Sequence, residues 1–257
     1  MPTLYAARAL CGILTPQANT KVEPEMALLM PPGAGTITAR LTSGCAAMND
    51  RLTDYFRAIE ATADQFANAP VQALGFACTG ASYLVGPAAE TALSTRFAAR
   101  GLPLVTAGQA IRTALGTLGA TRIAVASPYG DGLTDSALAY WRKQGLTVAQ
   151  VARIAENSTA FHPIYAHGAD HALHAAQTLL QDDTAEAVVL LGTGLPTLPA
   201  LAALAQAPRP VLSSNLCLAW ALHHTATATP PEAATLHAWR RGDHWRQRLA
   251  DTLPVSP

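Results

Sequence analysis

The chain has 257 residues, of which 50% are hydrophobic and 13% are charged, and its 17 basic side chains balance its 17 acidic ones. This length allows one large domain or two small lobes with their own cores. A net charge near zero, without a long basic run, argues against binding to nucleic acid or to an anionic membrane surface. No stretch approaches the roughly 18 apolar residues of a membrane span. Because the first residues also lack the pattern of a signal peptide, we expect a cytoplasmic protein.

Short apolar runs alternate with longer amphipathic segments along the chain, and each run ends in Gly, Ser, Thr, Pro or Asn. Such runs are typical of buried parallel strands that lead through a turn into a helix. The predicted strands are Cys11–Leu14, Ala73–Ala77, Leu104–Val105, Ile123–Ala126, Ala187–Leu191 and Val211–Leu212. The predicted helices are Asp50–Asn68, a helix from Tyr83 onward, Ala88–Arg100, Gln109–Leu118, Thr134–Gln144 and Asp170–Leu180. This alternation predicts an α/β fold with mostly parallel sheets.

Three segments of the first half resemble three segments of the second, in the same order and offset by a little over a hundred residues. GILTPQAN resembles AVASPYGD, ALGFACTGAS resembles VVLLGTGLP, and GLPLVTAGQAI resembles RPVLSSNLCLAW. Three pairs in register indicate a duplicated α/β unit. We therefore predict two pseudo-symmetric lobes, one formed by residues 1–110 with 214–257 and the other by residues 111–213.

The repeat sets two turns opposite each other, each directly after a predicted strand. Their residues are Cys78, Thr79 and Gly80 in the first half and Gly192, Thr193 and Gly194 in the second. Because ligands of open α/β sheets bind beyond the carboxyl ends of the strands, both turns should face one cleft between the lobes. Their N–H groups and hydroxyls could hold a carboxylate and stabilise charge that develops on it. Taken singly, either turn could also be no more than a tight turn.

Cys78 is the residue of this cleft best suited to chemistry. It precedes a predicted helix, whose N-terminal end should lower the pKa of the thiol and make it a nucleophile or a proton carrier. The alternative is a cysteine that only packs at the end of a strand. Cys11, Cys45 and Cys217 are expected to serve as small apolar residues. The spacing of the four cysteines predicts neither a disulfide framework nor a zinc site.

Three further residues remain open between a functional and a structural role. Tyr129 could donate a hydrogen bond to a carboxylate, or it could pack half-buried. Asn19 and Thr20 could contact a ligand or cap a helix, and capping is the default for Thr20.

The sequence carries no signature of a nucleotide, metal or cofactor site. G-x-G-x-x-G after a strand, the Walker A motif and the nucleophile elbow G-x-S-x-G are all missing. His167, His171 and His174 have helical spacing but no acidic or cysteine partner nearby, which favours a helix face over a metal site.

The motifs PQANTxxEPE, ACTGAS, SPYGD, EN, GTGLPTL and VLSSNLCLAW together resemble the aspartate/glutamate racemase superfamily, in the branch of maleate cis–trans isomerase and arylmalonate decarboxylase. The resemblance covers roughly residues 10–222. It implies two pseudo-symmetric Rossmann-like (flavodoxin-like) lobes with the active site in the cleft between them. It also implies that the enzyme uses no cofactor and no metal.

Members of this branch carry one catalytic position after a strand in each lobe. Racemases and maleate isomerases have cysteine at both, and arylmalonate decarboxylase has glycine at the first and cysteine at the second. This chain has Cys78 at the first and Gly192 at the second, so it mirrors the decarboxylase. The resemblance to the isomerase also implies that Asn19 and Asn157 bind substrate carboxylates, and Tyr129 matches a tyrosine of both enzymes.

These residues lead to three hypotheses, in this order. The first is a cofactor-independent isomerase of a small, maleate-like dicarboxylate, in which Cys78 adds to the alkene and an enediolate-type intermediate forms. The second is an arylmalonate-type decarboxylase, in which Cys78 donates a proton on the face opposite to the usual one. The third is a non-catalytic dicarboxylate-binding protein, which Gly192 permits. The expected partner is a small dicarboxylate, and the low-charge surface is consistent with a homodimer.

Overall fold

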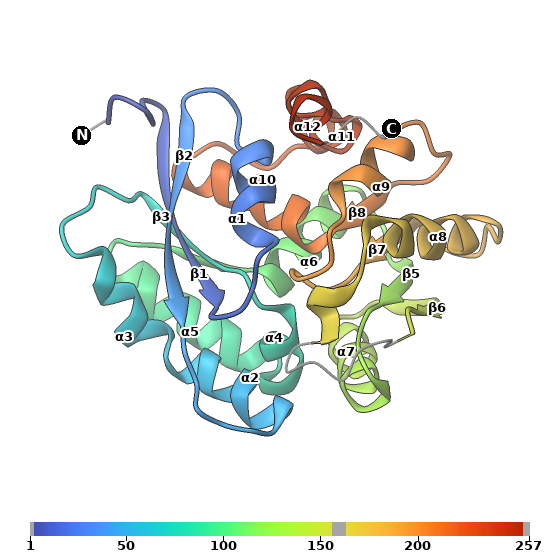
Figure 1. Cartoon of the computed structure of the whole chain (residues 1–257), viewed down its shortest axis with the longest axis horizontal. Coiled ribbons are helices and arrows are strands. Elements are labelled where there is room, and N and C mark those ends of the chain that lie inside the picture. Colours follow the sequence, from blue (N-terminus) through green and yellow to red (C-terminus); the bar gives the residue numbers. More distant parts are fainter. Residues whose placement is uncertain (1–2, 156–162, 254–257) are drawn as a thin grey trace.

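The computed structural model describes residues 3–155 and 163–253, and its framework is two four-stranded parallel sheets (Figure 1). The strand order is β2-β1-β3-β4 in the first sheet and β6-β5-β7-β8 in the second. The two sheets therefore have the same strand order, with β5 to β8 taking the places of β1 to β4. The two halves therefore share one topology, and the predicted α/β fold of two pseudo-symmetric, mostly parallel sheets is confirmed.

The first sheet consists of β1 (Ala9–Pro16), β2 (Ala34–Leu41), β3 (Ala73–Phe76) and β4 (Leu104–Thr106). The second consists of β5 (Arg122–Ser127), β6 (Thr147–Arg153), β7 (Ala187–Leu190) and β8 (Val211–Ser213). Every predicted run matches one of these strands, two of them with one residue too many (Ala77 and Leu191), but β2 and β6 were not predicted. Both are edge strands, mostly half-exposed, with Thr, Arg or Gln between their apolar residues, so no continuous apolar run marks them.

The first half contains α1 (Val22–Leu29), α2 (Met48–Arg57), α3 (Ile59–Ala63), the 3-10 turn η1 (Asp64–Phe66), α4 (Thr79–Val85), α5 (Pro87–Ala99) and α6 (Ala107–Thr117). The second contains α7 (Asp131–Lys143), η2 (Pro163–Ala166), α8 (Ala169–Leu180), α9 (Leu198–Ala203), α10 (Ser214–Ala226), α11 (Ala233–Arg241) and α12 (Arg246–Thr252). The helix predicted over Asp50–Asn68 was wrong as one element. Its first part, α2, packs on α4, whereas α3 packs on β1 and β2, so the chain bends between them. The helix predicted from Tyr83 begins earlier, at Thr79.

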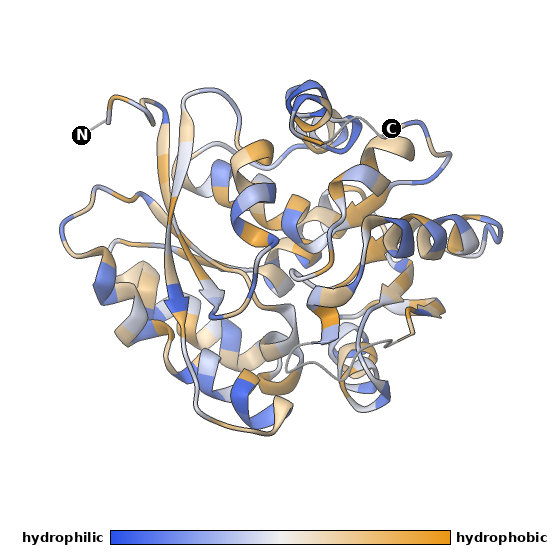
Figure 2. Ribbon diagram, viewed as in Figure 1, coloured by the Kyte–Doolittle hydropathy of each residue, from blue (hydrophilic) through white to orange (hydrophobic). Residues whose placement is uncertain are grey.

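The helix α10 connects the two halves. It directly follows β8 of the second sheet, yet it packs against α6, α1, β1 and β3 of the first half. Its residues Leu218 and Trp220 are completely buried. Figure 2 shows how hydropathy is distributed over the fold: hydrophobic residues lie along the strands, and hydrophilic residues lie on outer helices such as α8. None of the helices in the described part of the chain is long and apolar enough to span a bilayer.

Two buried carboxylates also cross the boundary between the halves. Glu25 on α1 accepts hydrogen bonds from the backbone N–H of Thr197 (2.6 Å) and the side-chain amide of Asn215 (2.8 Å). Glu90 on α5 accepts a hydrogen bond from the hydroxyl of Tyr140 on α7 (2.5 Å). Burial raises the pKa of both carboxyls, and the hydrogen bonds partly offset it. The two halves are thus joined by polar contacts as well as by α10.

Candidate active site

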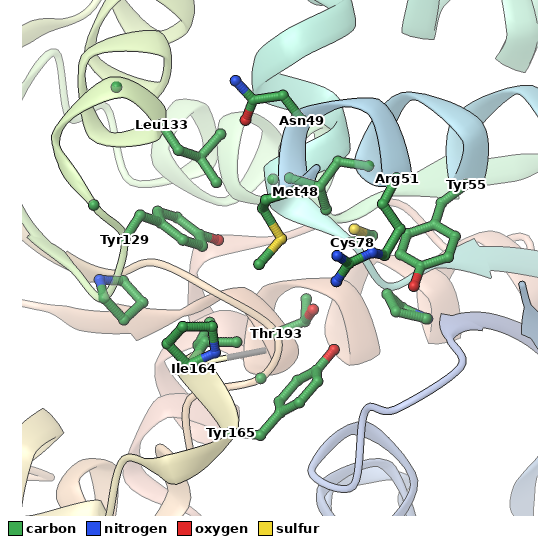
Figure 3. A pocket seen from close by; sticks show the side chains of 18 of the residues that line it. Met48, Asn49, Arg51, Tyr55, Cys78, Tyr129, Leu133, Ile164, Tyr165 and Thr193 are labelled. Carbon is green, nitrogen blue, oxygen red and sulfur yellow. The ribbon is translucent and has the colours of Figure 1, made fainter. Parts of the chain in front are cut away.

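A cavity of about 550 Å³ lies between the halves, beyond the carboxyl ends of their inner strands (Figure 3). Pro16 ends β1, Cys78 follows β3, Tyr129 follows β5 and Thr193 follows β7, and all four line the cavity. The structure therefore brings together the strand ends that the sequence repeat paired. Gly80 and Gly194 line it as well.

The two paired turns interlock across the boundary. Thr79, in the first turn, lies with its hydroxyl 2.8 Å from the hydroxyl of Tyr129 in the second half. Thr193, in the second turn, donates a hydrogen bond from its hydroxyl to the carbonyl of Ala77 in the first half (2.8 Å). Each threonine therefore fixes the opposite half, and Tyr129 is held with its hydroxyl at the cavity.

Asn19 is buried behind the second turn. Its amide donates to the carbonyl of Thr193 (3.4 Å), which also accepts from Asn215 (3.1 Å). Its side-chain oxygen accepts from the backbone N–H groups of Lys21 and Val22, so Asn19 closes the turn that leads into α1. Asn19 is not among the residues that line the cavity. Its role in binding substrate stays a prediction, and Asn157 lies outside the described residues.

Cys78 is 4% exposed and stands directly before α4. Burial raises the pKa of its thiol from 9.0 to about 12, while backbone hydrogen bonds from Ala81 and Gly80 act in the opposite direction. The expectation that the helix end would lower this pKa was wrong, because desolvation in a closed site penalises the thiolate more than two amides favour it. Cys78 is a neutral thiol at neutral pH.

The other cysteines lie away from the cavity lining. Cys11 and Cys217 are completely buried in the core, and burial raises the pKa of both thiols. Cys45 is partly exposed, and its thiol lies 3.0 Å from a carboxylate oxygen of Asp54.

Gly192 has a backbone φ of +91°, which favours glycine, and its surroundings are filled. A Cβ atom at this position would lie 2.8 Å from Cδ1 of Ile164 and 2.9 Å from Cγ of Pro128. Apolar side chains therefore fill the space that the Cβ atom of a cysteine at position 192 would need. The packing around Gly192 disfavours a second thiol in this cavity.

Sequence reasoning missed one wall of the cavity, which is a face of α2. Met48, Arg51, Leu52 and Tyr55 all line the cavity and follow the i, i+3, i+4, i+7 spacing of one helix face. The available signal was an arginine within this otherwise apolar and aromatic stripe. The opposite wall includes Tyr165, in η2, for which the sequence offered no signal.

The helix-face interpretation holds for His171 and His174 but not for His167, which is buried outside the helix, and His162 lies outside the described residues. His171 and His174 lie on α8 and His167 just before it, and the ring of His171 accepts a hydrogen bond from the N–H of Gly168. Within residues 3–155 and 163–253, no three His, Cys, Asp or Glu side chains are grouped so that they could hold a metal ion.

The family model of arylmalonate decarboxylase matches residues 11–236. The chain belongs to the arylmalonate decarboxylase family. The matched range contains both sheets, apart from the first two residues of β1, and every residue named above as lining the cavity. None of the curated proteins matches this family member.

Solved structures with the same fold include maleate isomerases as well as arylmalonate decarboxylase. The maleate isomerase Iso from Pseudomonas putida is 24% identical, with a TM-score of 0.76 over 86% of this chain and 94% of that one. A cysteine-to-serine mutant of the Nocardia farcinica maleate cis–trans isomerase, with a covalently bound succinylcysteine intermediate, is 24% identical, with a TM-score of 0.74 over 86% and 94%. Arylmalonate decarboxylase is 20% identical, with a TM-score of 0.70 over 84% and 92%. The family match agrees with the branch that the sequence motifs indicated, and these structures show that the fold is shared.

Proposed function

We propose that this family member is a cofactor-independent isomerase of a small, maleate-like dicarboxylate, with Cys78 as its nucleophile. The observation that carries the proposal is the place of Cys78 in the cavity, beside the linked hydroxyls of Thr79 and Tyr129 and opposite a turn without a thiol. The Nocardia isomerase mutant holds its succinylcysteine although one of its cysteines has been replaced. One cysteine can therefore carry a covalent adduct in this fold.

In the proposed reaction the Cys78 thiol first gives its proton to water. The thiolate then adds to one alkene carbon, and the π electrons move onto the carboxylate attached to the other carbon. The resulting enediolate is stabilised by hydrogen bonds from the Tyr129 hydroxyl and the N–H groups of the turns. Rotation about the new single bond follows. The electrons of the enediolate then re-form the alkene in the trans form, the C–S bond breaks with its electron pair leaving on sulfur, and the thiolate is protonated again.

Decarboxylation of a 2-substituted malonate is the second candidate, and the neutral state of Cys78 favours it. One C–C bond breaks, CO₂ leaves, and the remaining enediolate takes the thiol proton on the Cys78 face. Water then reprotonates the sulfur. Leu52, Leu133 and Ile164 line the cavity and offer an apolar surface for the substituent. The product should have the hand opposite to that made by a thiol in the second half.

Proton NMR in D₂O with the purified protein separates the candidates. Conversion of maleate to fumarate supports the isomerase, whereas loss of CO₂ from 2-methyl-2-phenylmalonate with α-deuteration supports the decarboxylase. If both compounds raise the melting temperature but neither is converted, the enzymatic proposals are wrong and the non-catalytic binding hypothesis gains support.

A further inference from the structure

The peptide group between Thr193 and Gly194 forms part of the cavity wall, and its carbonyl points away from the cavity. This carbonyl accepts hydrogen bonds from the side-chain amides of Asn215 (3.1 Å) and Asn19 (3.4 Å). Both asparagines are 1% exposed and neither lines the cavity, whereas Thr193 and Gly194 do. The peptide is trans, so its N–H and C=O groups point in opposite directions. The N–H of Gly194 is therefore directed toward the cavity.

This N–H group is a donor that the protein itself leaves unused. Gly194 is buried, and among the described residues no backbone or side-chain atom accepts a hydrogen bond from its N–H. A buried donor without an acceptor costs free energy, and an oxygen atom of a bound ligand would supply the missing partner. The direction of this donor depends on the groups that hold the carbonyl on the other side of the peptide.

Glu25 fixes the orientation of the Asn215 amide that holds this carbonyl. One of its carboxylate oxygens accepts from the backbone N–H groups of Thr197 (2.6 Å) and Leu198 (3.2 Å). The other oxygen accepts from the side-chain amide of Asn215 (2.8 Å). A carboxylate only accepts hydrogen bonds, so the NH₂ group of Asn215 has to face Glu25 and cannot exchange places with its oxygen. In this orientation the same NH₂ group also reaches the Thr193 carbonyl.

We propose that Glu25 is a positioning residue for the reaction. Through Asn215 and the Thr193 carbonyl, it keeps the N–H of Gly194 directed at the substrate carboxylate on which negative charge develops. The inference rests on the proposed function for the presence of that carboxylate. It applies to isomerisation and to decarboxylation alike, because both proposed reactions pass through an enediolate, and a donor held in place acts most strongly on developing charge. Glu25 itself does not line the cavity.

NMR makes this peptide visible when threonine carries ¹³C in its carbonyl and glycine carries ¹⁵N. The sequence has two Thr-Gly pairs, Thr79-Gly80 and Thr193-Gly194, so an HNCO spectrum contains two signals, and Gly80→Ala assigns them by removing the first. In the Cys78→Ala protein, which leaves the ligand unconverted, saturation with maleate or 2-methyl-2-phenylmalonate should move the Gly194 amide proton downfield. If neither compound moves this proton, the inference is overturned.

Glu25→Gln tests the role of the carboxylate. The new amide would meet the Asn215 amide as a second donor, and Asn215 relieves this conflict by turning its oxygen toward position 25, which withdraws its donor from the Thr193 carbonyl. We therefore expect the Thr193 carbonyl signal to move upfield and the response of Gly194 to the ligand to decrease. With Cys78 intact, kcat should fall about 10- to 100-fold with a smaller change in KM, since the donor is misdirected and not removed.

Glu90→Gln is the matched control, because Glu90 is also a buried carboxyl that joins the two halves. Glu25→Gln and Glu90→Gln should both lower the melting temperature, but Glu90→Gln should leave the Thr193 carbonyl signal in place. Asn215→Ala is a second variant that keeps the backbone donors of Glu25 and should also move this signal. An unchanged signal in both Glu25→Gln and Asn215→Ala refutes the positioning role.

The double variant Glu25→Gln, Asn215→Asp separates positioning from stability. Its two side chains can form their hydrogen bond again with donor and acceptor exchanged, so part of the melting temperature should return. An aspartate cannot donate to the Thr193 carbonyl, so neither the carbonyl signal nor kcat should recover. Recovery of kcat together with the melting temperature would show that Glu25 contributes only to stability. If the ligand moves the Gly194 signal but the wild-type protein converts neither compound, the oriented donor is retained and the proposed function is refuted.

Discussion

The two turns that face the cavity occupy equivalent places in the two sheets and share a Thr-Gly pair, yet they differ at the residue before that pair. The first presents the thiol of Cys78 at the start of α4, whereas the second begins with Gly192 and a positive φ. The second turn is also anchored from behind, because the Thr193 carbonyl accepts from both Asn19 and Asn215. The two halves thus share one framework, but only the first turn carries a thiol.

Replacement of Cys78 by alanine removes the thiol that distinguishes the first turn from the second, and we expect it to have the largest effect on turnover. Without the thiol neither nucleophilic addition nor proton delivery can occur, so turnover should fall by about 10²- to 10⁴-fold, the usual contribution of such a group. The NMR assay measures the loss. Cys45→Ser is the matched control, since Cys45 does not line the cavity, and full activity in Cys78→Ala would place the chemistry elsewhere.

The alkylation of Cys78 by iodoacetamide should depend steeply on pH. Because burial raises the pKa of the thiol from 9.0 to about 12, the thiolate fraction should increase about tenfold per pH unit from pH 7 to 10 without a plateau. Mass spectrometry of the labelled peptide over this range provides the rate at each pH. A plateau of the alkylation rate below pH 9 would mean that the end of the helix lowers the pKa of the thiol more than burial raises it.

Tyr129→Phe removes the hydroxyl through which the second half reaches the first turn. If this hydroxyl stabilises the enediolate, kcat should fall by about 10²- to 10³-fold, as for other donors to a developing oxyanion. Tyr5→Phe, at a side chain that is 90% exposed, serves as the control. A change confined to KM would instead assign Tyr129 to binding alone.

The glycines of the two turns should respond unequally to alanine. Gly192→Ala must adopt a positive φ and meets Ile164 and Pro128, so we expect a loss of about 1–3 kcal/mol in the free energy of unfolding. Gly80→Ala lies in α4, where the new Cβ would be 3.1 Å from the flexible side chain of Leu52, and should cost less than about 1 kcal/mol. Urea denaturation of both variants measures the two losses in the free energy of unfolding. Equal losses would show that backbone conformation and packing do not make Gly192 the more sensitive position.

The inner framework was predictable because continuous apolar runs mark strands that are covered on both faces. The same logic fails for β2 and β6, whose exposed edges admit Thr, Arg and Gln. The internal repeat provided a long-range relation that local patterns lack, since it paired Cys78 with Gly192 from sequence alone.

The residues that line the cavity, and their protonation, were harder to predict from the sequence than the strands were. Arg51 belongs to an ordinary amphipathic helix, and only the orientation of α2 shows that its arginine faces the cavity. The direction of the Cys78 pKa shift also depended on the degree of burial, which local sequence does not specify. Asn19 was recognised as a polar residue at a strand end, but its contact with Thr193 spans 174 residues of chain.

The buried carboxylates Glu25 and Glu90 bear on how a substrate reaches Cys78. Parting the halves would strip each carboxylate of donors from the other side, at Thr197 and at Tyr140. Such a motion would break several buried hydrogen bonds at once. We therefore expect the two halves to keep a fixed relative position during the reaction. Substrate and product should enter and leave the cavity through movements of side chains at its opening.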